Sequence, residues 1–222
     1  MTTTPEQLLT IYRRLLEAFG PQHWWPGQTV FEIILGAILT QNTSWANVEK
    51  AIANVRAAGR LEPNALHELD AETLETLIRP AGYFRVKAKR LRNFLQWLFD
   101  EYGGDVAALE NVETSRLREE LLGVSGIGPE TADSILLYAL DRPVFVVDTY
   151  TARVMVRHGL VEPEIDYQQL QDLFESHLEP DVPLFNEYHA LLVRVGKEFC
   201  KPKPKCPACP LEPLPHTIEL QP

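Results

Sequence analysis

Apolar residues recur three and four positions apart along most of this 222-residue chain, which is the spacing of one face of an α-helix. The run from Phe31 to Ile38 follows it closely and predicts a buried helix. The helices expected from this pattern are residues 29–40, 85–100, a helix capped by Thr114 or Ser115, 167–178 and 184–198. Together they predict an all-α fold class.

The segments between these helices are rich in proline and glycine, which is typical of turns and loops. Pro143 to Val147 is the one strand-like run, and it is too short and isolated to predict a sheet. The N-terminus lacks a basic region followed by an apolar core, so we expect no signal peptide. The longest apolar run, Ile33 to Leu39, is too short to cross a membrane. We therefore expect a cytoplasmic protein without membrane contact.

A glycine turn, Gly126-Ile127-Gly128, stands between two expected helices, and Pro129 opens the second of them. Glycines allow positive φ angles and remove side chains from the turn. The N–H groups of Gly126 and Gly128 can then face a DNA phosphate, which is a contact that does not depend on base sequence. An ordinary helical hairpin with a glycine turn would show the same local pattern.

The formal net charge of −10 argues against broad, nonspecific coating of nucleic acid. Two basic segments run against this mean, and composition alone favours solvated helix faces for both: Arg85 to Arg92, and Arg194 to Lys205. Near the second segment, the three cysteines Cys200, Cys206 and Cys209 lie within ten residues. Such crowding indicates a metal or cluster loop, because a disulfide scaffold would spread its cysteines along the chain.

Four stretches in this order give the chain a resemblance to the endonuclease III superfamily of DNA glycosylases: FEIILGAILTQNTSW, IRPAGYFRVKAKRL, LLGVSGIGPETADSILLYAL and VFVVDTY. The resemblance implies two helical lobes with a central DNA-binding cleft. One lobe would comprise residues 29–136 with the hairpin, and the other residues 1–28 plus 137–222. The partner would be double-stranded DNA with a damaged base flipped out of the helix, bound by a monomer.

Asp148 takes the position of the superfamily's catalytic aspartate, at the base of the cleft. It could equally cap the helix that follows, and the two roles are compatible. A carboxylate at a helix N-terminus stays ionised because N–H donors and the helix dipole favour the anion. Bifunctional members carry a lysine where this chain has Glu130, and a carboxylate cannot form a Schiff base. The resemblance therefore implies a monofunctional glycosylase without AP lyase activity, in which water attacks the sugar; Glu130 itself is expected to be a surface residue.

Aromatic residues suggest a base-binding pocket formed by Trp24, Trp25 and Trp45, although core packing would explain any single tryptophan. By resemblance, Gln41 and Asn42 border the pocket, and Gln41 fills the gap left by the flipped base. The WWPG segment and Trp45 look most like the 3-methyladenine glycosylase branch. The expected substrate is therefore an alkylated purine, chiefly 3-methyladenine, whose positive charge favours stacking on aromatic rings.

Many superfamily members hold a [4Fe–4S] cluster with four cysteines near the C-terminus. The spacing here, Cys200-x5-Cys206-x2-Cys209, leads to Pro215 at the fourth position, with His216 beside it. The three cysteines with His216 could hold a cluster or zinc, the cysteines alone could hold a cluster with an exogenous ligand, or the loop could be empty; we favour a cluster. It would present three lysines to DNA phosphates: Lys201, Lys203 and Lys205.

Three other functions fit parts of this pattern. An endonuclease III-like glycosylase could act on oxidised pyrimidines or mismatched bases with the same motifs. A non-catalytic DNA-binding module would use the hairpin alone, but it would need neither Asp148 nor the aromatic residues. A helical interaction protein without DNA would suit the acidic net charge, but it leaves the ordered motifs unexplained.

Overall fold

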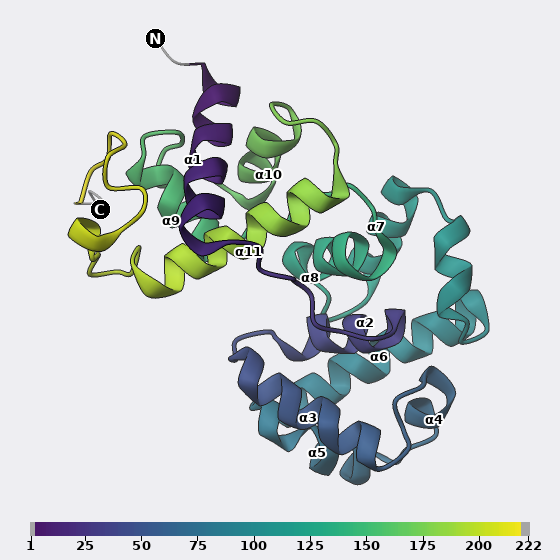
Figure 1. The fold of residues 1–222 in the computed structure, drawn as a ribbon. Helices are drawn as coiled ribbons and strands as arrows, with labels where there is room; N and C mark the ends of the chain where they lie inside the picture. The colour runs from purple at the N-terminus through teal and green to yellow at the C-terminus, as the bar shows by residue number, and fades with distance from the viewer. Residues whose placement is uncertain (1–2, 219–222) are drawn as a thin grey trace. The chain divides into compact units, whose positions relative to one another are not determined.

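The computed structural model describes residues 3–218 of the chain, and every regular element in that part is helical. Because residues 3–218 contain no strand, the predicted all-α fold class is confirmed. The chain forms two compact units (Figure 1): unit 1 comprises Met1–Trp24 and Pro143–Pro222, and unit 2 comprises Trp25–Arg142. No helix in the described residues is long and apolar enough to cross a membrane.

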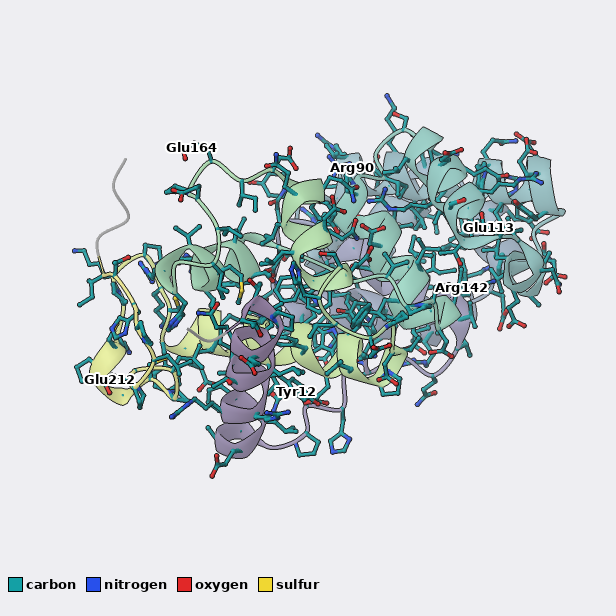
Figure 2. All side chains as sticks on the ribbon, turned by 90° about the horizontal axis from the view of Figure 1, so that it is seen from above. Tyr12, Arg90, Glu113, Arg142, Glu164 and Glu212 are labelled. Carbon is teal, nitrogen blue, oxygen red and sulfur yellow. The ribbon has the colours of Figure 1, made fainter. Side chains whose placement is uncertain are left out.

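Unit 2 begins at Trp25 and ends at Arg142, whereas the expected lobe comprised residues 29–136. Side-chain contacts at both ends give the reason. Trp25 packs its ring against Trp45 and Tyr138, both in unit 2. Arg142 donates a hydrogen bond to the carbonyl oxygen of Val112 at 3.2 Å, which ties the end of the second hairpin helix to the same unit. Figure 2 labels Arg142 there.

Unit 2 is a compact set of α-helices and short 3₁₀ or π turns. Its elements are α2 (Val30–Leu39), α3 (Trp45–Ala57), α4 (Pro63–His67), α5 (Ala71–Ile78), η1 (Arg79–Ala81), α6 (Phe84–Tyr102), η2 (Val106–Asn111), α7 (Thr114–Gly123), α8 (Pro129–Ser134) and the π-helical η3 (Ile135–Ala139). The apolar helix α2 is buried along most of its length. The predicted cap of α7 is wrong by one residue: the side chain of Glu113 accepts from the N–H of Arg116 at 2.9 Å.

Most of the basic segment on α6 is exposed, as composition favoured, but one of its lysines is not. Lys87 is only 1% exposed. Its ammonium group donates to the carbonyl oxygens of Leu39 and Ala81 at 2.8 and 2.7 Å. Burial, together with the charge of Arg90, lowers the pKa of Lys87 to about 8. Lys87 thus closes the C-terminal end of α2, because its ammonium replaces the water that would bind these carbonyl groups.

Unit 1 combines the first helix with the C-terminal third of the chain (Figure 1). Its elements are α1 (Thr4–Phe19), α9 (Thr149–Arg157), α10 (Tyr167–Glu175), α11 (Val182–Glu198) and η4 (Cys206–Ala208). Tyr188 on α11 is fully buried and donates its hydroxyl to the carbonyl oxygen of Leu8 on α1 at 2.8 Å. Gly196 allows α11 to approach α9, because a Cβ there would lie 2.5 Å from a ring carbon of Tyr150.

The strand-like run from Pro143 to Val147 belongs to no regular element and pairs with no strand in the described residues. Its backbone bonds instead to side chains of α10. Phe145 donates its N–H to Glu175 at 2.8 Å, and Gln171 donates to the Phe145 carbonyl oxygen at 2.8 Å. The ring of Phe145 stacks on Phe174, with centroids 3.9 Å apart. This run therefore fixes the backbone immediately before Asp148.

Candidate active site

Asp148 lies at the N-terminus of α9, immediately after the run from Pro143 to Val147. Its Oδ1 accepts hydrogen bonds from the N–H of Thr151 at 2.8 Å and from the Thr151 hydroxyl at 2.9 Å. The expected helix cap is therefore present. The side chain of Asp148 is 11% exposed, so most of the carboxylate is removed from water. Because Oδ1 is committed to Thr151, Oδ2 is the oxygen that remains for another partner.

The electrostatic surroundings of Asp148 favour its anion. Burial raises the pKa of the carboxyl group, but His189 and the two Thr151 donors outweigh burial, and the pKa is lowered from its ordinary value of 3.8. The expectation of an ionised carboxylate therefore agrees with the local geometry. A buried anion of fixed orientation is suited to stabilising positive charge in a transition state.

His189 on α11 lies beside this carboxylate and was missed at the level of the sequence. Its Nε2 is 3.7 Å from Oδ2 of Asp148, and its side chain is 7% exposed. That distance is an ionic contact when the imidazole is protonated, and it is too long for a direct hydrogen bond. A signal was present: His189 shares the apolar face of its helix with Phe185 and Leu192, at spacings of four and three residues.

The hairpin turn has a glycine, Gly126, at a position where a side chain would not fit. Gly126 has φ = 101°, and a Cβ there would lie 2.3 Å from Cγ of Arg90. Asn93 donates to the carbonyl oxygen of Ser125 at 2.8 Å, so α6 holds this turn from behind. Gly126 is therefore required both by its backbone angle and by the close approach of Arg90, which Figure 2 labels.

The turn leaves N–H groups available to an anion. Within residues 3–218, the N–H groups of Gly126 and Gly128 donate to no protein acceptor. Gly128 begins α8 without a side-chain cap, and a Cβ there would meet no atom within 4 Å. The fold itself therefore does not need glycine at position 128. A small residue there keeps the helix N-terminus open, as a phosphate-binding turn requires.

A buried ion pair joins the two hairpin helices. Arg118 on α7 holds Asp133 on α8 through two hydrogen bonds of 2.6 and 3.0 Å. The Asp133 side chain is completely buried, and that of Arg118 is 23% exposed. Such a bidentate contact has a fixed geometry, so it sets how α7 and α8 meet at the turn. Glu130, which precedes this pair on α8, is exposed.

The connection between α2 and α3 carries both residues predicted to border the pocket. The side-chain amide of Gln41 donates to Thr131 at 2.9 Å and to the Gly126 carbonyl oxygen at 3.1 Å, and its oxygen accepts from Arg90. Gln41 is thus bound to the hairpin. Asn42 is exposed, has φ = 54°, and has no side-chain hydrogen bond to the described residues.

Two of the predicted tryptophans lie together. Trp25 and Trp45 meet edge to face with ring centroids 5.0 Å apart, and both are half-buried in unit 2. Tyr138, which the sequence analysis missed, lies 5.0 Å from Trp25. Gly36 makes room for them, since a Cβ there would be 3.0 Å from the Trp25 indole nitrogen. Trp24 is half-buried and falls in unit 1.

The cysteine loop forms a pocket of its own in unit 1. It is lined by all four predicted ligands, namely Cys200, Cys206, Cys209 and His216. Burial and the neighbouring thiols of Cys200 and Cys206 raise the pKa of Cys209. Yet among residues 3–218 no three His, Cys, Asp or Glu side chains gather as they would around a single metal ion.

The three lysines of the same loop have no carboxylate partner within residues 3–218. Lys203 and Lys205 are exposed and Lys201 is half-buried, and none forms an ion pair within residues 3–218. Figure 2 labels Glu212 further along this loop. Unpaired ammonium groups on a loop can bind phosphate without losing an existing contact.

Comparisons with known proteins agree with this geometry. A family model described as "HhH-GPD superfamily base excision DNA repair protein" matches residues 35–180. A protein of Methanocaldococcus jannaschii, provisionally named DNA repair glycosylase MJ1434, is 46% identical over 93% of this chain and 94% of its own length. The motif-based resemblance is confirmed at the level of the superfamily.

Two solved structures share the fold. The H. pylori 3-methyladenine DNA glycosylase MagIII bound to 1,N6-ethenoadenine matches 88% of this chain and 97% of its own, with a TM-score of 0.72 and 29% identity. A trapped covalent intermediate of endonuclease III with DNA matches 95% of this chain and 94% of its own, with a TM-score of 0.79 and 25% identity.

Proposed function

The chain belongs to the HhH-GPD superfamily of base excision DNA repair proteins, and we propose that it is a monofunctional DNA glycosylase that releases alkylated purines, chiefly 3-methyladenine, from double-stranded DNA. The observation that carries this proposal is the Asp148 centre. It combines a buried carboxylate, a lowered pKa and one oxygen that is not used by the helix cap. A protein that only binds DNA has no need of such a group.

The reaction follows from the carboxylate. As the bond between base and sugar breaks, its electron pair leaves with the base, and the sugar gains oxocarbenium character. Oδ2 of Asp148 stabilises that positive charge. Water then forms the new bond to the sugar carbon, and Asp148 or solvent accepts its proton. A base that is already cationic leaves as a neutral molecule, so strong acid catalysis at the base is not needed.

His189 acts in this scheme as a positioning residue. It contacts Oδ2 of Asp148 from the opposite helix at 3.7 Å, and both side chains are largely buried. With Thr151 holding Oδ1, the carboxylate has contacts on both oxygens and little freedom to rotate. A preoriented anion costs less reorganisation when the sugar becomes positively charged.

The absence of a lyase step rests on Glu130. It occupies the position of the bifunctional members' lysine, and it is exposed on the first turn of α8. Lys87 is an unsuitable substitute, because its ammonium group is buried and bound to two carbonyl oxygens. These two observations support the proposed hydrolysis by water without a covalent enzyme–sugar intermediate.

The substrate class rests on the aromatic residues. The half-buried rings of Trp25 and Trp45 cluster in unit 2 with the buried ring of Tyr138, and the two indoles are the rings on which we propose that a purine stacks. Stacking is stronger for a cationic base. The likeness to MagIII, a 3-methyladenine glycosylase, supports the same substrate class. Gln41 and Asn42 remain the proposed gap-filling segment of unit 2, with Asn42 the more exposed of the pair, and Trp24 remains a predicted contact of the base.

Hairpin and cysteine loop would bind the DNA backbone. The free N–H groups of Gly126 and Gly128 suit one phosphate, and the lysines of the loop suit others. We further propose a [4Fe–4S] cluster on Cys200, Cys206 and Cys209. When bound, the cluster would supply no step of the reaction and would hold the loop in shape.

A second candidate is an endonuclease III-like glycosylase for oxidised pyrimidines or mismatched bases, which is favoured by the likeness to endonuclease III. One experiment separates the candidates. Duplexes that each carry 3-methyladenine, 7-methylguanine, hypoxanthine or thymine glycol are incubated with the protein, and abasic sites are detected with and without alkali. We expect release of 3-methyladenine and strand breaks only after alkali.

Three outcomes would contradict the proposal. Release of thymine glycol alone would favour the second candidate, an endonuclease III-like glycosylase. Strand breaks without alkali, or trapping of a covalent adduct by borohydride, would overturn the monofunctional mechanism. Binding of DNA without release of any base would leave only a DNA-binding module.

A further inference from the structure

Two cations of α6, Lys87 and Arg90, lie one helical turn apart without a carboxylate partner. Neither forms an ion pair within the described part of the chain, residues 3–218. Burial and the charge of Arg90 lower the pKa of Lys87, so the two cations are close enough to repel each other. The chain has a formal net charge of −10, yet none of its described carboxylates compensates this pair. Unpaired positive charge at such a site favours binding of an anion.

The Arg90 side chain lies directly against the hairpin turn. A Cβ at Gly126 would lie 2.3, 3.0 and 3.1 Å from Cγ, Cδ and Cβ of Arg90. Arg90 is half-buried, and Figure 2 labels it. Its stem therefore carries the guanidinium beside the turn whose free N–H groups we assign to a DNA phosphate.

The side chain of Gln41 is bound on both of its polar atoms. Its oxygen accepts from Arg90, and its amide donates to the Thr131 hydroxyl at 2.9 Å and to the Gly126 carbonyl oxygen at 3.1 Å. A guanidinium only donates and a carbonyl oxygen only accepts, so these partners fix the orientation of the amide. In this docked arrangement Gln41 cannot fill a gap in DNA, because its polar groups are committed to the protein.

Release of Gln41 requires little movement of the backbone before it. The carbonyl oxygen of Leu39 is held by the ammonium group of Lys87 at 2.8 Å. Thr40 donates its N–H and its hydroxyl to the Gly36 carbonyl oxygen at 2.9 and 2.6 Å. A change of side-chain torsion angles at Gln41 is therefore enough to break its three contacts, while α2 stays in place.

We propose that Arg90 is a phosphate ligand beside the hairpin turn, and that it exchanges the Gln41 oxygen for a phosphate oxygen when DNA binds, which releases Gln41 to fill the gap left by the flipped base. This rests on the proposed function, from which the phosphate at the turn and the role of Gln41 both come. A guanidinium bonds more strongly to a charged phosphate than to a neutral amide oxygen. Because Arg90 reaches the phosphate only after Gln41 is released, phosphate binding shifts the equilibrium toward release.

The phosphate contact of Arg90 is tested by the salt dependence of DNA binding. Fluorescence anisotropy gives the Kd of the full chain for an undamaged duplex over a series of KCl concentrations. Arg90→Gln should weaken binding roughly tenfold. It should also reduce the slope of log Kd against log [KCl] by about 0.9, because one phosphate contact fewer releases fewer counter-ions. Arg90→Lys keeps the charge and should keep the slope, whereas loss of a purely structural contact would weaken binding without changing the slope.

Arg92→Gln is the matched control for this measurement. Arg92 carries the same charge on the same helix, but its guanidinium donates to the carbonyl oxygen of Leu69, so its slope should equal that of the wild type. Arg90→Met, which keeps an unbranched stem against Gly126, is measured beside Arg90→Gln so that the result does not depend on the folding of one variant. An unchanged slope in these Arg90 variants, or an equal loss of slope in Arg92→Gln, would overturn the phosphate contact.

The release of Gln41 is tested through the Thr131 hydroxyl. Stopped-flow fluorescence follows binding to a duplex that carries 2-aminopurine beside a tetrahydrofuran abasic analogue. Thr131→Val removes one contact of the docked Gln41, so the fluorescence change should be about fivefold faster, with the salt slope unchanged. Gln41→Ala should lose the fluorescence change. A rate in Thr131→Val equal to that of the wild type, or a fluorescence change that persists in Gln41→Ala, would overturn the release.

Base release from a duplex with 3-methyladenine is measured on the same preparations so that the two proposals fail separately. A reduced slope in Arg90→Gln and a faster change in Thr131→Val, in a protein that releases no base, would leave this inference standing and overturn the glycosylase. Base release by the wild type with an unchanged slope in Arg90→Gln would do the reverse.

Discussion

The helices α8 and α9 begin in opposite ways, although both N-termini suit an anion. α9 begins at Asp148, whose own carboxylate accepts from the N–H of Thr151. α8 begins at Gly128 with no side-chain cap, and the N–H groups of Gly126 and Gly128 donate to no acceptor within residues 3–218. The N-terminus of α9 therefore carries an anion from the protein itself, whereas the N-terminus of α8 is open to the DNA phosphate that we propose.

This difference separates two tasks of a glycosylase. The internal anion is buried and fixed, as required of a group that stabilises charge on the sugar. The external site is exposed and has no side chain, as required of a contact that any DNA phosphate can make. The supporting contacts differ as well, because His189 faces Asp148, whereas the hairpin is held by Arg90, Asn93 and the Arg118–Asp133 pair.

The largest effect is expected from Asp148→Asn. Asparagine keeps the helix cap but removes the charge, so base release should fall by about a thousandfold or more, while DNA binding is largely retained. The fall in base release is measured as the single-turnover rate on a duplex that contains 3-methyladenine. Asp166→Asn is the matched control, because Asp166 caps α10 in the same way, at 2.8 Å from the N–H of Gln169. Full activity of Asp148→Asn would remove the catalytic assignment.

Arg118→Ala tests the support of the hairpin. The variant removes both hydrogen bonds that Arg118 donates to the buried Asp133, so the free energy of unfolding should fall by about 3–5 kcal/mol. Urea denaturation measures this change. Arg116→Ala, which breaks an exposed pair with Glu120 on the same helix, should cost less than about 0.5 kcal/mol. Equal losses in the two variants would show that the buried pair does not hold the hairpin.

Gly128→Ala tests the external anion site without disturbing the fold. A Cβ at this position meets no protein atom within 4 Å, so stability should change by a few tenths of a kcal/mol. DNA affinity should fall roughly tenfold, since a hydrogen bond to a charged group contributes about 1.5 kcal/mol. Binding to undamaged duplex is measured by fluorescence anisotropy. If binding is unchanged, the phosphate does not sit at this turn.

The smallest effect is the pH dependence that Asp148 gives to stability. Its pKa is lower in the folded protein than the ordinary value of 3.8. Its ionisation therefore stabilises the fold above that value, and this contribution is lost as the pH falls through the folded pKa. The difference in unfolding free energy between the wild type and Asp148→Asn should be constant between pH 7 and about 5 and should shrink below pH 3.8. A difference that grows on acidification would mean that the folded protein raises the pKa.

The sequence predicted the helices well where one face is apolar over several turns, as in α2, α6 and α11. The prediction was wrong where a single contact determines the cap of a helix or the burial of a side chain. Glu113, not Thr114 or Ser115, caps α7, because several neighbouring polar residues can serve as caps. Lys87 is buried, not solvated, because one of the carbonyl groups that bind its ammonium is that of Leu39, 48 residues away in the sequence.

By itself the sequence determined the all-α class, the hairpin, Asp148 as a helix cap, and the superfamily, since each depends on residues that are close together or on motifs in a fixed order. Only the tertiary structure decided which side chains meet. It paired Asp148 with His189, Trp25 with Tyr138, and Arg157 with Cys200. These pairs are separated by tens of residues, and no local spacing records them, because they arise only when the helices pack.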